Sequence, residues 1–237
     1  MNASTLPVIG LITGDTRGSI SAEREFHQQL AGVADVATTR VPLFQISYSS
    51  LDKMMGGLPA AAQILAGCDA SVIVWNSMSG SCLRGRETIN LLEQKVGIPV
   101  LVPSIEFVNC LRELDASRIA LVSPHGVELS LLEKIFFDKN GIDVVKVVQL
   151  LENFDGDVRN VDRITPDEIL RCVRQTDFQD VDAVVFDNPA CALLPIIEEL
   201  DLHIKKPILP HNQVLMRAAL RRVGVSSTSI FIDPYFQ

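Results

Sequence analysis

Short apolar segments recur along this chain at an offset close to 110 residues. Ile9 and Ile119 occupy equivalent places in two of them, and Trp75 and Phe186 do so in two others. The segments are rich in β-branched residues and are separated by longer stretches of helical period, which is typical of parallel strands covered by helices on both faces. We therefore expect an α/β protein that contains a duplicated unit. Any α/β chain places similar strands at similar intervals, so coincidental spacing stays open as an alternative.

The same pattern predicts where the elements and the two lobes lie. Strands are expected at residues 8–12, 71–75, 98–102, 118–122, 183–186 and 207–209. Helices are expected at 21–30, 50–66, 86–96, 106–114, 127–139, 166–175, 192–200 and 213–223. The first lobe should comprise residues 1–104 plus 217–237, and the second residues 105–216. Each lobe should be a mainly parallel sheet flanked by helices, with a pseudo-two-fold axis relating the lobes and a cleft between them.

Composition narrows the classes of partner and compartment. The 237 residues are 47% hydrophobic, enough for a substantial core, and the formal net charge of −8 argues against nucleic acid or an anionic membrane as a partner. Five scattered cysteines without metal-ligand spacing indicate reduced thiols rather than a disulfide or zinc framework. No basic-then-apolar leader and no membrane-length apolar run is found. We expect a cytoplasmic protein without cofactor or metal, and homo-oligomerisation stays open.

Ligands of parallel sheets bind beyond the carboxyl ends of the strands, where helix N-termini present their N–H groups. The loops expected there are rich in hydroxyl, amide and small residues, which suit a small anion. These residue types also serve as helix caps and turn formers, so each loop has a purely structural alternative. The candidates in these loops are Asp15, Asn76, Ser77, Ser79, Gly80, Ser81, His125, Asp187, Asn188, Cys191, His211 and Asn212.

Several ordered fragments resemble the aspartate/glutamate/hydantoin racemase superfamily. They include Ser-Gly-Ser-Cys-Leu-Arg-Gly at 79–85, Leu-Arg-Glu-Leu at 111–114 and Lys-Pro-Ile-Leu-Pro-His-Asn-Gln at 206–213. Within the superfamily, the chain looks nearest to the branch of maleate cis-trans isomerases and arylmalonate decarboxylases. The resemblance implies two α/β lobes with the active site between them, and cofactor-independent chemistry on a small carboxylate or dicarboxylate.

The resemblance also implies a pair of cysteines, one per lobe, on opposite sides of the substrate. Such a pair can remove a proton from one face of a carbon and deliver one to the other. In this chain, Ser77 stands at the first cysteine position and Asn188 at the second. A serine hydroxyl is far less acidic than a thiol, and an amide does not exchange protons usefully at neutral pH. Both thiol mechanisms of the family are therefore in doubt here.

Other residues offer replacements for the missing thiols. Cys191 lies three residues beyond Asn188, where a local insertion would bring its thiol to the cleft, although an inert buried thiol is the alternative. His125 stands where the branch commonly has a tyrosine that touches the substrate, and it could transfer a proton or simply cap a helix. Asp15 and Asp187 could act as bases or as helix caps.

The remaining candidates have binding roles by the same resemblance. Ser79, Gly80 and Ser81 keep the family's spacing and would cradle a carboxylate through N–H and hydroxyl donors. His211 and Asn212 would close a second carboxylate pocket, and Asn76 would shape the wall.

Three functions follow from these residues. The first is an isomerase, racemase or decarboxylase that moves a proton on a small carboxylate, with Ser77, Ser79 and Asn188 holding carboxylates. The second is a catalytically silent relative that binds a metabolite, which the loss of both cysteines favours. The third is a hydrolase or lyase with Ser77 as nucleophile, which needs a histidine or carboxylate within hydrogen-bond reach.

Overall fold

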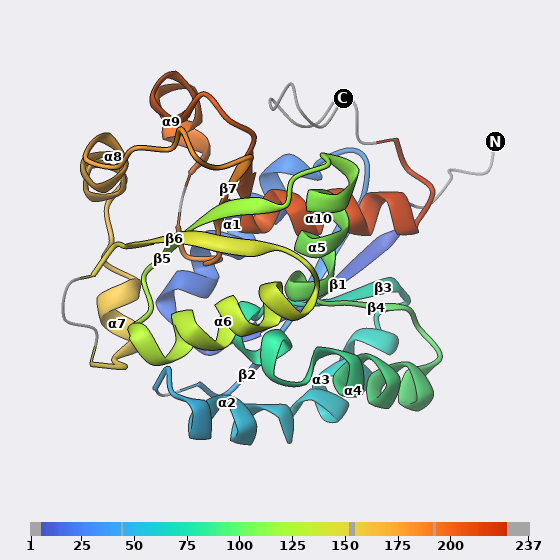
Figure 1. The fold of residues 1–237 in the computed structure, drawn as a ribbon. Coiled ribbons are helices and arrows are strands. Elements are labelled where there is room, and N and C mark those ends of the chain that lie inside the picture. The colour runs from blue at the N-terminus through green and yellow to red at the C-terminus, as the bar shows by residue number, and fades with distance from the viewer. Residues whose placement is uncertain (1–5, 44, 152–154, 192, 227–237) are drawn as a thin grey trace.

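Two four-stranded parallel sheets form the framework of the molecule (Figure 1). The computed structural model describes residues 6–43, 45–151, 155–191 and 193–226. The first sheet has the order β2-β1-β3-β4, and the second has the order β6-β5-β7-β8. The strands are β1 Val8–Gly14, β2 Asp35–Val41, β3 Ala70–Trp75, β4 Val100–Leu101, β5 Arg118–Ser123, β6 Asp143–Gln149, β7 Ala183–Phe186 and β8 Ile208–Pro210. Since the second order repeats the first, the expected α/β fold of two similar lobes is confirmed.

Helices flank both sheets. They are α1 Arg17–Gln29, α2 Tyr48–Met55, α3 Leu58–Ala66, α4 Met78–Val96, α5 Pro103–Glu113, α6 Val127–Lys139, α7 Val158–Val161, α8 Pro166–Arg174, α9 Ile197–Ile204 and α10 His211–Arg222, with a 3-10 turn at Leu194–Ile196. Side chains next to the first turn determine where some of these helices begin. For α8, the side chain of Thr165 accepts from the backbone N–H of Glu168 and the Glu168 carboxylate accepts from the N–H of Thr165, which is a complete capping box.

Two strands were not expected from the sequence, namely β2 and β6. Each is the outer strand of its sheet, and each pairs only with β1 or β5 among the described strands. Most of their side chains are half-buried or exposed, and they include charged residues such as Arg40 and Lys146. Edge strands carry such residues because one side of the strand faces solvent. The expectation of uniformly apolar strands therefore missed them.

Two helices carry core residues across the boundary between the lobes. Helix α10 follows the last strand of the second sheet, but its Leu215 and Met216 pack with Ile9 of the first sheet. Helix α5 follows the first sheet, and its Phe107 packs with Leu121 of the second. The two lobes therefore share buried apolar surface through exchanged helices. The lobe boundaries at residues 104/105 and 216/217 stay a prediction.

All five cysteines are free thiols. Among the described residues, none of the helices combines the length and the apolar character that crossing a membrane requires.

Candidate active site between the lobes

A cavity of about 70 Å³ lies where the carboxyl ends of the central strands of both sheets meet. Its wall combines the loop after β3 (residues 76–79), His125 after β5, and the loop after β7 (residues 187–190). The loop after β1 and residues of α7 close the remaining sides. This is the position in which parallel α/β sheets bind ligands.

The loop after β3 places the N-terminus of α4 at the cavity. Ser77 is the residue before the helix, and Met78 and Ser79 form its first turn. Gly80 keeps this turn tight against the strand, because a Cβ at this residue would lie 2.7 Å from Oγ of Ser77 and 2.8 Å from the Trp75 ring. The backbone of α4 is non-helical at Arg84, so the helical segment at the cavity spans only residues 78–83. Its first turn has N–H groups without intrahelical acceptors, and these can donate hydrogen bonds to an anion.

The loop after β7 is held to the end of β5. The backbone N–H of Asp187 donates to the carbonyl of Val122 at 3.3 Å, and Oδ1 of Asn188 accepts from the N–H of Ala190 at 2.8 Å. Nδ2 of Asn188 lies 3.4 Å from Nε2 of His125. Burial lowers the pKa of His125, so its imidazole is neutral at pH 7 and Nε2 can accept this hydrogen bond.

A pair of buried carboxyl groups lies beside the cavity. Glu133, from α6, and Asp187, after β7, are both fully buried, and an oxygen of each carboxyl group lies within 4.8 Å of one of the other. Oγ of Ser79 donates to Oε1 of Glu133 at 2.5 Å. Burial, and then the charge of Asp187, raise the pKa of Glu133 well above its usual value. Burial therefore favours the protonated form of Glu133, and Ser79 and Asp187 link it to the cavity wall.

His211 joins the two strand-end loops behind the cavity. Nδ1 donates to the backbone carbonyl of Asp187 at 2.7 Å, and Nε2 lies 2.6 Å from Oδ1 of Asn76. Burial lowers the pKa of His211 to about 3, so the ring is neutral and carries its proton on Nδ1. A neutral ring with its proton on Nδ1 can only accept at Nε2, so the oxygen and nitrogen of the Asn76 amide must exchange places for its NH₂ group to donate to the ring. His211 is thus a structural link between the lobes.

Among the described residues, one trio could hold a metal ion. His125, Glu133 and Asp187 each offer a ligand atom within 4.8 Å of the other two. The trio could equally be satisfied by a proton on Glu133, because a protonated carboxyl donates to its neighbour without any ion.

The structure brings half of the predicted site residues to the cavity. Those that line it are Asn76, Ser77, Ser79, His125, Asp187 and Asn188. Gly80 and Ser81 lie behind the wall, where Oγ of Ser81 donates to the carbonyl of Met78 and accepts from the N–H of Ser104. The side chain of Asp15 is exposed. Nδ2 of Asn212 donates to Glu25 and to the carbonyl of Pro189, outside the cavity.

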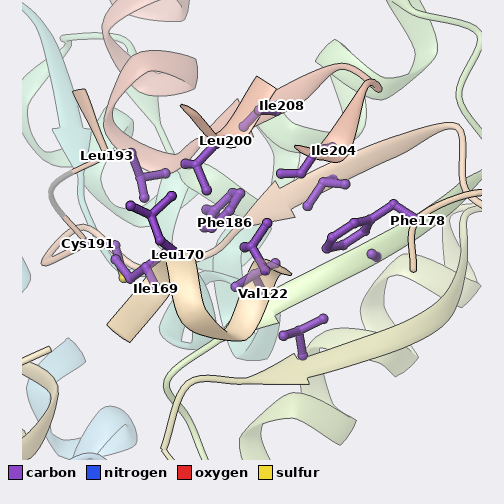
Figure 2. Close-up of a cluster of buried hydrophobic side chains, with 14 of the residues drawn as sticks. Val122, Ile169, Leu170, Phe178, Phe186, Cys191, Leu193, Leu200, Ile204 and Ile208 are labelled. Atoms are coloured by element: carbon purple, nitrogen blue, oxygen red, sulfur yellow. The ribbon is translucent and has the colours of Figure 1, made fainter. Parts of the chain in front are cut away.

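Cys191 is not brought to the cavity either. Its side chain packs in the apolar core of the second lobe, beside Leu170 and Leu193 (Figure 2). Burial, and then the charge of Asp187, raise the pKa of this thiol far above its usual value. A thiol in such surroundings stays protonated and inert, so this placement gives no support to Cys191 as the proton-transfer group.

Glu133 is the site residue that the sequence reasoning missed. A signal was present, because Leu129, Glu133 and Phe137 recur at a spacing of four and share the buried face of α6. A carboxylate within an apolar helical stripe is rarely buried without a partner. The partners, Ser79 and Asp187, are 54 residues away in sequence on either side, and sequence spacing does not reveal them.

The fold and the cavity together define a class of protein. Its members have two duplicated α/β lobes, a small polar cavity between the carboxyl ends of the strands of both sheets, and acidic groups beside that cavity. Comparison with known proteins identifies the group within that class. The sequence profile of the family described as arylmalonate decarboxylase matches residues 9–230. The chain belongs to this family.

Individual relatives are more distant. A maleate isomerase of Alcaligenes faecalis is 25% identical over 138 residues, which are 57% of this chain and 53% of that protein. The chain thus spans about half the length of this curated relative. A maleate cis-trans isomerase of Nocardia farcinica, with a covalently bound succinylcysteine intermediate, superposes with a TM-score of 0.86 at 19% identity, covering 98% of this chain and 96% of that one. An arylmalonate decarboxylase superposes with a TM-score of 0.75 at 17% identity, covering 92% and 93%. Both likenesses establish the fold.

Proposed function

We propose that the protein binds a small carboxylate or dicarboxylate in the cavity between the lobes and moves a proton on it without a cofactor. The reaction class is that of an isomerase, racemase or decarboxylase. The carrying observation is the convergence of two repeat-related loops on one cavity, with Ser77 from the first lobe and Asn188 from the second in its wall. Family membership supports the same reaction class.

Binding of a carboxylate would rest on neutral donors. Neither Lys nor Arg is among the described residues that line the cavity. The donors available are the hydroxyls of Ser77 and Ser79, the amide of Asn188 and the free N–H groups at the start of α4. Several hydrogen bonds to a carboxylate in a confined site can replace a counter-ion, as in an oxyanion hole.

Proton transfer would use groups other than thiols. The Nocardia farcinica relative forms its covalent intermediate on a cysteine, but this chain has Ser77 and Asn188 where the family resemblance expects cysteines. His125 is available as a base, because its imidazole lines the cavity and is neutral at pH 7. The hydrogen bonds of the described residues give the hydroxyl of Ser77 no histidine or carboxylate partner, which disfavours the serine-nucleophile hypothesis.

A silent metabolite-binding relative is the second candidate function. The replacement of both thiol positions favours it, since the family chemistry depends on them. A screen of maleate, aspartate, glutamate and arylmalonates separates the two candidates. Ligand-observed NMR reports binding, and product formation in the same tubes reports turnover. Turnover of any one acid supports the enzyme, whereas binding without any turnover supports the silent relative.

A further inference from the structure

We propose that the protein forms a homodimer in which helix α6 packs antiparallel against α6 of a second copy of the chain. The contact is made by a row of exposed apolar side chains, Val127, Leu131 and Ile135, which we call the α6 stripe. This inference goes beyond the proposed function. It concerns an interaction surface, and it does not depend on what the cavity binds.

The α6 stripe is apolar surface that the described chain leaves uncovered. Val127 is 74% exposed, Leu131 52% and Ile135 42%. Figure 1 shows α6 on the near side of the molecule, and its outward side has no helix or strand over it. The other large apolar side chains that are exposed among the described residues occur singly, one to a helix or strand. Single exposed apolar residues are ordinary, whereas a contiguous row indicates a contact surface.

Helical spacing explains why these three side chains form one surface. Residues four apart in an α-helix lie on the same face, so the stripe runs along the outward face of α6. The opposite face packs into the cores of the molecule through Leu129 and Phe137. A helix with apolar residues on both faces is typically buried on both. Folding of one chain covers the inner face and leaves the outer face for a partner.

Two charged residues beside the stripe identify the partner as a second copy of this chain. Glu128, near the start of α6, and Lys139, at its end, are both exposed, and the ion pairs of the described residues include neither. They are about three helical turns apart, so they lie on the same side of the stripe. In an antiparallel pair of identical helices the same side of each helix meets. Glu128 of each copy then faces Lys139 of the other, whereas a parallel pair would place like charges at the same end.

One register satisfies the charged and the apolar contacts together. The pair Glu128 and Lys139 and the pair Leu131 and Ile135 are both centred near residue 133. The antiparallel arrangement that joins the charges therefore also places Leu131 of each copy beside Ile135 of the other. Val127 then meets the aliphatic part of Lys139. A surface that complements itself in this way is what a two-fold symmetric interface requires.

Strand β6 extends the surface beside α6. It packs against α6, as Figure 1 shows, and it is the outer strand of its sheet. Val148 points into the core on the α8 side of the sheet, so Val147 points to the side of α6, and it is 37% exposed. A stable interface buries roughly 800 Å² on each partner. The contact therefore includes the adjoining part of β6 as well as the stripe.

The oligomeric state in solution tests the stripe. Analytical ultracentrifugation of the full chain should find a dimer, and Leu131→Glu should raise its dissociation constant at least about 10²-fold, because an unpaired buried carboxylate is costly. Leu202→Glu makes the same change at an exposed leucine of α9 and should keep the wild-type constant. Circular dichroism verifies that each variant is folded. The proposal is overturned by a wild type that stays monomeric up to about 100 μM, by a dimer that Leu131→Glu leaves intact, or by equal weakening in Leu202→Glu.

Charge exchange tests the antiparallel arrangement and leaves the apolar stripe untouched. Glu128→Lys and Lys139→Glu should each raise the dissociation constant by about 3- to 30-fold, because each places like charges opposite one another twice in the dimer. The double variant restores both pairs and should recover the wild-type constant. Single variants with the wild-type constant, or a double variant without recovery, overturn the arrangement. Both positions are exposed, so this test also decides the proposal where Leu131→Glu does not fold.

Discussion

The hydroxyl of Ser79, in the first turn of α4, donates a 2.5 Å hydrogen bond to Oε1 of Glu133 on α6. This bond joins a residue of the predicted carboxylate cradle to the buried carboxyl pair, and both partners are buried. Helix α6 follows the second sheet's first strand yet packs against α4, as Figure 1 shows. The contact therefore links the two lobes beside the cavity.

Removing the hydroxyl of Ser79 tests how much its hydrogen bond to Glu133 stabilises the protein. Ser79→Ala leaves Glu133 without its only described donor, so we expect a loss of about 1–2 kcal/mol in the free energy of unfolding. The bond also lowers the pKa of Glu133, and its loss should raise that pKa further. Urea unfolding measures the first effect. Ser71→Ala, at an exposed position, should change stability by less than about 0.5 kcal/mol, and an equal loss in both variants would contradict the account.

Ionisation of Glu25 should lower the free energy of unfolding as the pH rises. Burial raises its pKa from 4.5 to about 7, against the effect of the hydrogen bond from Asn212. The folded protein thus binds this proton more tightly than the unfolded chain, so the stabilisation is complete below pH 4.5 and is lost as the pH rises to about 7. Each pKa unit is worth about 1.4 kcal/mol, and the total is about 3 kcal/mol.

The measurement compares wild type with Glu25→Gln by urea unfolding at pH 5 and pH 8. The variant lacks the ionisable group, so its stability relative to wild type should improve by about 2–3 kcal/mol between the two pH values. Glu128→Gln should show no such change. A constant difference between wild type and Glu25→Gln at both pH values would exclude the raised pKa.

Cys191 should resist alkylation in the folded protein. The thiolate is the reactive form, and burial raises the pKa of this thiol while the core of the second lobe covers it (Figure 2). Cys68 is exposed and provides an internal comparison. Peptide mass spectrometry after a short iodoacetamide pulse should find Cys68 modified and Cys191 intact. Modification of both at similar rates would return Cys191 to the list of proton-transfer groups.

His211 should contribute strongly to stability. In His211→Leu the carbonyl of Asp187 and the amide of Asn76 each lose a buried partner, and an unsatisfied buried polar group costs about 1–3 kcal/mol. We expect a total loss of about 2–5 kcal/mol by chemical unfolding. His203→Leu, at an exposed site on α9, is the matched control. A loss below 1 kcal/mol in His211→Leu would show that the imidazole does not link the two loops.

The sequence predicted the duplicated sheets because buried parallel strands are apolar and repeat at a constant offset. It did not predict β2 and β6, since half-exposed edge strands lack that signature. For the site, residues just after a strand, such as Ser77 and Asn188, line the cavity as expected from the strand ends that fix their loops, and their roles stay predictions. Glu133 was missed because its contacts are long-range in sequence. The sequence left open whether Cys191 reaches the cavity or is a buried thiol, and the structure places its side chain in the core.

The central claim is that the cavity between the lobes carries out proton transfer on a small carboxylate. ¹H NMR in D₂O tests it most directly, with the rate of α-proton loss from the best-bound acid compared between wild type and Ser77→Phe, whose ring would fill the cavity of about 70 Å³. The account predicts enzyme-dependent loss of the α-proton signal in the wild type and none in Ser77→Phe. Exchange at the same rate in both proteins, or bound acid without any exchange in the wild type, would contradict it.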